Sequence, residues 1–186
     1  ATVATSPTVL FDVTRADVVE LSISREHWKL MDPGAGSSFL RGAKKPKGKT
    51  PPPATQPDPA DEVALRQGRM GDALAYVKCS VNFDGEKLAD VGVRYKGHFS
   101  LSVSAATPRR PFKIDFERFA DGRKFAGVAM LNLNNHAVDP SQARETLSYE
   151  LFRELGVPAS RTGYALVYLT VAGLYEHEYL GLYTLI

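Results

Sequence analysis

The sequence predicts an α+β fold, in which a mostly antiparallel sheet packs against one long helix. Three observations lead to this prediction. Several short segments alternate apolar and polar residues, Asp84 and Gly85 form a hairpin signal between two of them, and residues 139–155 are amphipathic. The chain has 186 residues, 44% of them apolar, which is enough to build a core.

The predicted elements follow one another with clear turns between them. A strand-like lead at 9–13, a strand at 17–24 and a short helix at 24–32 come first. After a long gap, strands are expected at 75–83, 88–96, 111–116, 128–133, 164–170 and 179–186. Their alternation leaves one side of each strand for the core.

The predicted helix at 139–155 has recognisable ends. Asp139 is placed to cap its first turn, and Gly156 follows its last residue. Leu147, Leu151 and Leu155 share one stripe of the helix surface. We therefore expect this stripe to pack across one face of the sheet.

Residues 33–68 interrupt the pattern. The segment is rich in proline and lysine and almost lacks large apolar side chains, so burial there does not offset the entropy of ordering. We divide the chain into an N-terminal strand and helix at 1–32, a flexible insertion at 33–68, and an α+β lobe at 69–186. A basic contact surface for an anionic partner is the alternative interpretation of the insertion.

The totals exclude several classes of protein. A net charge of +2 gives no reason to expect nucleic-acid binding, and no apolar run is long enough for a membrane span. Cys79 is the only cysteine, so an internal disulfide is impossible, and its place in a strand indicates a buried small side chain. The first residue is alanine, which indicates processing or trimming and is compatible with export, while a cytoplasmic location stays open.

Polar side chains gather on two of the predicted strands. Arg94 and Lys96 share one face, and Gly97 would let backbone amides approach a phosphate near Ser100. Lys113 projects from the polar face of the next strand. The alternative interpretation is a turn at the end of a strand and a solvated outer face.

Charged and amide side chains also mark the helix. Arg144 projects within the apolar stripe. Either an anion pairs with its guanidinium, or its aliphatic stem lies on the core while the guanidinium stays in water. The asparagines of Leu131-Asn-Leu-Asn-Asn135 either form a turn or orient the entrance of the helix beside a ligand. No pair of acids indicates a metal site, since the aspartates fit strand, turn and cap positions.

An ordered series of motifs resembles the CotH family of atypical protein kinases, which is named for a bacterial spore-coat protein. The motifs are VGVRYKG at 91–97, PFKIDF at 111–116, LNLNN at 131–135, RETLSYELFRELGVP at 144–158, RT at 161–162 and YLGLY at 179–183. The resemblance implies the N-terminal lobe of an atypical kinase that transfers phosphate from ATP, with Mg²⁺ or Mn²⁺, to protein Ser/Thr. It also implies a location outside the cell or on the cell or spore surface.

The resemblance also implies roles for particular residues. Lys113 would pair with a helix glutamate, for which we favour Glu150 over Glu145. The residues expected to hold the nucleotide are Arg94, Lys96, Gly97, Ser100 and Arg144. The family continues into a second half that carries the metal-binding aspartates, so we expect this chain alone to bind ATP weakly and to transfer no phosphate. Its expected partners are a protein substrate and its own C-terminal half.

Two other functions remain open from the sequence. One is a non-catalytic protein-binding or surface-assembly module that uses the basic insertion as a contact. The other is a module associated with surface polysaccharide. The only support for this interpretation is the tyrosine and tryptophan content.

Overall fold

The computed structural model describes residues 10–31, 64–67 and 73–186 of the chain. Within these ranges the strands are β1 (Ala16–Ile23), β2 (Ala64–Gln67), β3 (Ala73–Phe83), β4 (Glu86–Tyr95), β5 (Phe112–Asp115), β6 (Met130–Asn134), β7 (Gly163–Val171) and β8 (Tyr175–Leu185). The helices are α2 (Arg25–Met31), α3 (Phe99–Val103) and α4 (Arg144–Glu154).

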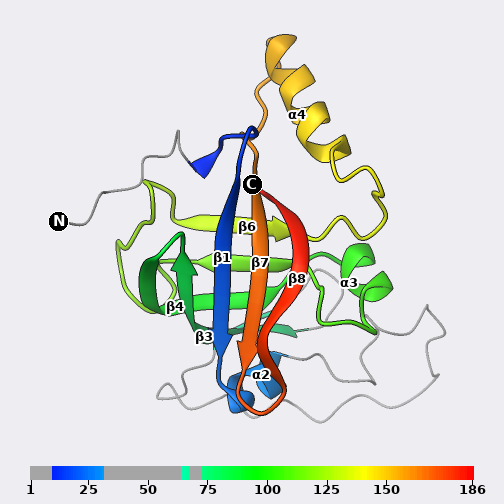
Figure 1. Ribbon diagram of the computed structural model, residues 1–186. Coiled ribbons are helices and arrows are strands. Elements are labelled where there is room, and N and C mark those ends of the chain that lie inside the picture. Colours follow the sequence, from blue (N-terminus) through cyan, green and yellow to red (C-terminus); the bar gives the residue numbers. More distant parts are fainter. Residues whose placement is uncertain (1–9, 32–63, 68–72) are drawn as a thin grey trace.

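Seven of these strands form a sheet that closes on itself (Figure 1). The order is β1-β7-β8-β6-β5-β4-β3, and β3 then pairs with β1 to complete the circuit, while β2 adds to the other end of β3. Every pairing is antiparallel except that of β1 with β7, which is parallel. The sheet of the described residues is therefore mixed.

The predicted fold class is wrong in its main feature, because no long helix in the described ranges packs on this sheet. α4 has 11 residues, and the exposed fractions of Leu147, Leu151 and Leu155 are 61%, 55% and 69%. Gln142 has a φ of 56°, which interrupts the expected helix after its first residues. A closed sheet buries the inner faces of its strands against one another, so its core does not require a covering helix.

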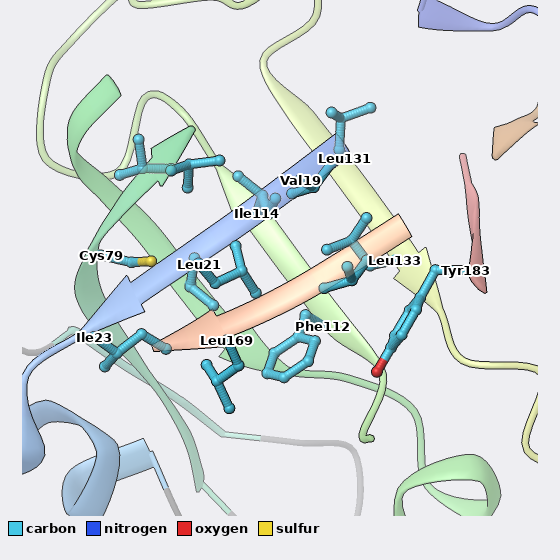
Figure 2. Close-up of a cluster of buried hydrophobic side chains, with 14 of the residues drawn as sticks. Val19, Leu21, Ile23, Cys79, Phe112, Ile114, Leu131, Leu133, Leu169 and Tyr183 are labelled. Carbon is cyan, nitrogen blue, oxygen red and sulfur yellow. The ribbon is translucent and has the colours of Figure 1, made fainter. Parts of the chain in front are cut away.

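The inner side chains of the closed sheet form the core (Figure 2). Val19, Leu21 and Ile23 of β1 project inward with Ile114 and Leu133, which belong to strands on other sides of the circuit. Cys79 is buried in the same cluster, as its position in the strand pattern predicts, and this burial raises the pKa of its thiol to about 12.

The predicted hairpin between β3 and β4 is confirmed. Asp84 and Gly85 have φ angles of 47° and 92°, the left-handed pair that a two-residue turn of this kind requires. The Asp84 carboxylate also accepts a hydrogen bond of 2.7 Å from the backbone N–H of Val18, so the turn is tied to β1. The hairpin therefore helps to close the sheet.

The expected insertion falls mainly outside the described residues, as does the start of the N-terminal lead. Its residues 64–67 are described, and they form β2 in antiparallel pairing with β3. No helix within the described ranges is long and apolar enough to cross a membrane.

Candidate functional site

Three polar side chains meet where β4 and β6 end and α4 begins. Lys96 follows the last residue of β4, Asn134 is the last residue of β6, and Glu145 lies in the first turn of α4. The amine of Lys96 donates a hydrogen bond to Oδ1 of Asn134. Nδ2 of Asn134 lies 2.7 and 2.8 Å from the two carboxylate oxygens of Glu145. We call this arrangement the Lys96–Asn134–Glu145 cluster.

The strand alternation explains why these groups meet outside the core. Tyr95 and Leu133 are fully buried, so the residues that follow them, Lys96 and Asn134, project to the outer side. The backbone N–H of Lys96 donates to the carbonyl of Pro111 at 3.0 Å, which extends the pairing of β4 and β5 by one step. The cluster therefore sits on two paired parts of the sheet.

A cavity of about 310 Å³ opens beside the cluster. Its polar lining includes Lys96, Ser100, Asn134, His136, Asp139, Arg144 and Glu145. Pro111, Ala137 and Val138 supply an apolar part of the wall. The volume is at the lower end of the range for sites that hold small molecules.

Lys96 is partly buried and lies near both a carboxylate and two other cations. Burial is the main cause that lowers the pKa of Lys96, and the neighbouring charges of Lys113 and Arg94 lower it further, whereas Glu145 opposes the shift. Burial likewise lowers the pKa of His136, with a further contribution from Arg109. An anion near Lys96 would relieve this repulsion between cations.

Arg94 and Lys113 form a second row of cations next to the cavity. They are direct cross-strand partners on β4 and β5, so both project from the outer face of the sheet, as does Lys96, two residues after Arg94. The Arg94 guanidinium lies 5.0 Å from the centre of the Tyr76 ring. It also donates a hydrogen bond of 2.8 Å to the backbone carbonyl of Tyr95. Neither Arg94 nor Lys113 lines the cavity itself.

Gly97 joins β4 to α3 and not to another strand. Its φ is 74°, and a Cβ atom at this position would lie 2.6 Å from Oγ of Ser100. The glycine therefore permits both the backbone turn and the close approach of the serine that lines the cavity.

Arg144 pairs with an acidic side chain just before α4, although the solvent-facing position of the stripe does not require a partner. Its Nε lies 3.4 Å from Oδ1 of Asp139, and the side chain is largely exposed. The Asp139 carboxylate also accepts a hydrogen bond of 2.9 Å from the backbone N–H of Arg144. Arg144 thus lines the cavity at the start of α4.

Glu150 lies in a different place from the lysines. It lines a second cavity, of about 340 Å³, together with Phe11, Arg161 and Thr162, and its carboxylate is 3.8 Å from Arg153. The glutamate that the structure brings to Lys96 is Glu145. Five helical residues turn the chain by about 140° beyond a full circle, so Glu145 and Glu150 cannot face the same side.

The sequence interpretation ranked Glu145 below Glu150 because it assumed that the leucine stripe faces the sheet. The stripe faces solvent, so the other side of the helix, which carries Glu145, approaches the body of the protein. The alternation of Leu131-Asn-Leu-Asn-Asn135 was the one sequence pattern that indicated the cluster, since it places Asn134 on the same outer side of the sheet as Lys96. No sequence pattern indicated that His136 also lines the cavity.

The described residues do not fit a divalent metal. No group of three or more histidine, cysteine, aspartate or glutamate side chains within those ranges is arranged to hold one. In the cavity, Asp139 accepts hydrogen bonds from Ser141 and Arg144, and Glu145 is held by Asn134. Both carboxylates of the cavity are therefore engaged already.

Comparison with known proteins identifies the matched part of the chain. The family model described as CotH kinase protein matches residues 93–186, which include Arg94, Lys96, Lys113 and α4. No curated protein matches the chain significantly. The matched segment covers half of the chain and contains the whole Lys96–Asn134–Glu145 cluster, and the chain therefore belongs to the CotH kinase family.

Proposed function

We propose that this chain is the nucleotide-binding part of an atypical protein kinase that transfers phosphate from ATP to serine or threonine of a protein substrate. The Lys96–Asn134–Glu145 cluster is the observation that carries the proposal. Phosphoryl transfer depends mainly on positioned positive charge, and kinases use a lysine that a helix glutamate holds in place. Here Asn134 joins the lysine to the glutamate.

In this proposal Lys96 donates to oxygens of the nucleotide phosphates, and Glu145 keeps the amine in position through Asn134. Arg94 and Lys113 add positive charge beside the phosphates from the outer face of β4 and β5. Ser100 and Arg144 line the same cavity and are placed to donate further hydrogen bonds. ATP supplies the phosphoryl group, and these residues bind and orient it.

The divalent ion of the proposal, Mg²⁺ or Mn²⁺, needs ligands other than the described residues, because these do not form a metal site. We therefore expect the chain to bind the nucleotide weakly and to need those additional ligands for transfer. As part of the same proposal, the substrate protein is encountered outside the cell or on the cell or spore surface.

The test is the affinity of the chain for a fluorescent ATP analogue. Lys96→Ala should weaken binding about 10- to 100-fold, since a charge-assisted hydrogen bond is worth about 1.5–3 kcal/mol. Glu150→Gln is the matched control and should leave the affinity unchanged, because Glu150 lies at the other cavity. Equal affinities for the unaltered chain and Lys96→Ala would refute the assignment of the lysine.

A γ-phosphate transfer assay tests the kinase activity itself. It is carried out on this chain and on the full gene product, with Mg²⁺ and with Mn²⁺. Transfer by the full gene product that Lys96→Ala abolishes would support the proposal. A full gene product that binds no nucleotide and transfers no phosphate would favour a protein-binding or assembly module instead.

One observation favours that second function, namely the exposed apolar side of α4. A purely catalytic lobe has no need of leucines in solvent, whereas a module that assembles with other proteins uses such surfaces. The two functions are separable, because Lys96 lies outside α4 and the exposed leucines of α4 do not line the cavity.

A further inference from the structure

α4 stands away from the closed sheet at one end of the molecule (Figure 1). Thr146 is its only buried residue, and the helix makes no extensive contact with another described helix or strand. An isolated helix of 11 residues is only marginally stable in water. A packing partner would therefore stabilise α4 considerably.

The solvent side of α4 carries several large apolar side chains. Leu147 and Leu151 lie on it one turn apart, and Phe152 and Leu155 continue it toward the end of the helix, all of them largely exposed. Exposed apolar surface that gathers on one element commonly marks a contact with another protein. Single exposed apolar residues are ordinary, but a group of four on one short helix and its C-cap is not.

The charges on this side identify the partner. Along the stripe the order is Arg144, Leu147, Leu151 and Glu154, with spacings of three, four and three residues. When this order is laid against its own reverse, arginine meets glutamate and leucine meets leucine. A second α4 in antiparallel orientation places Arg144 opposite Glu154 and Leu147 opposite Leu151, twice each because the contact is two-fold symmetric. Antiparallel helices also set opposite ends of their dipoles side by side.

We propose that α4 is a self-association surface, through which two copies of this chain form an antiparallel helix pair. This inference does not depend on nucleotide binding through Lys96, although Arg144, which contacts Asp139 and lines the cavity, belongs to both surfaces. One short helix from each copy makes a small interface, so we expect a dimer that dissociates at roughly micromolar concentrations. Both Arg144 and Glu154 are exposed, which leaves their charged groups accessible to the second copy.

Sedimentation equilibrium of the chain, from about 1 to 200 μM, tests the proposal. We expect a monomer–dimer equilibrium whose dissociation constant rises at least about 10-fold in Leu151→Asp, because the substitution places a charge in the apolar contact. Leu174→Asp is the matched control. Leu174 is exposed on the β7–β8 hairpin, away from α4, and its substitution should leave the equilibrium unchanged.

Charge reversal tests the antiparallel register. Glu154→Arg places like charges opposite each other at both ends and should raise the dissociation constant about 5-fold. Adding Arg144→Glu restores opposite charges and should return the constant to within about 2-fold of the original. These substitutions lie on exposed positions, so the fold should persist, which the thermal melting curve checks.

Three outcomes would overturn the inference. The chain sediments as a monomer over the whole range, or the dimer persists in Leu151→Asp, or the double charge reversal fails to restore association.

Discussion

Two leucines distinguish the closed sheet from the layout in which α4 covers a sheet. Leu133 on β6 is fully buried between β5 and β8, with register partners Phe112 and Leu185, whereas Leu151 on α4 is 55% exposed. Leu133→Ala removes core packing and leaves a cavity, which costs about 2–5 kcal/mol. Leu151→Ala removes little buried surface and should cost less than about 0.5 kcal/mol.

Urea denaturation followed by circular dichroism measures both free energies of unfolding, and thermal melting gives a second reading. For a domain of this size, Leu133→Ala should lower Tm by about 4–20 °C, while Leu151→Ala should leave it nearly unchanged. The protein concentration must stay below about 1 μM, because association through α4 would add stability that Leu151→Ala removes. Equal losses for the two variants at that concentration would refute the closed-sheet description of the core.

Two further predictions concern ionisable groups. Burial raises the pKa of Asp17 to about 6, above its usual value, so the ionised carboxylate is less favourable in the folded protein. The stability contributed by this group is therefore present below about pH 4 and is lost as pH rises through about 6. Asp17→Asn should flatten the curve of unfolding free energy against pH between these two values. If the variant loses the same stability over this interval, the loss belongs to another group. Glu145→Gln removes the carboxylate that opposes the shift at Lys96, so the pKa of Lys96 should fall further, which NMR titration of its side chain measures. An unchanged pKa of Lys96 in Glu145→Gln would show that the glutamate does not act on the lysine. Glu150→Gln is the control and should leave this pKa unchanged.

Much of the site follows from local patterns in the sequence. Alternation along β4 places Arg94 and Lys96 on one face, and alternation along β5 places Lys113 on the polar side, as the cross-strand pairing of Arg94 with Lys113 shows. The pairing of Lys96 with Glu145 does not follow from such patterns. It depends on which side of α4 approaches the sheet, and the helix sequence carries an apolar stripe that indicates the opposite side.

The sequence by itself determined most of the strands, the hairpin at Asp84 and Gly85, and the buried place of Cys79. These features depend on side-chain alternation and on backbone preferences of neighbouring residues, which are local properties. The sequence did not predict β2, which lies in the expected insertion, and the expected strand-like lead at 9–13 has no strand in its described residues 10–13. Only the tertiary structure decided that β1 pairs with both β7 and β3, since these contacts join residues that are about 60 or more positions apart in the chain. That closure gives the strands their own core, and the physical consequence is that α4 remains uncovered, with its leucines in solvent and Glu145 turned toward Asn134.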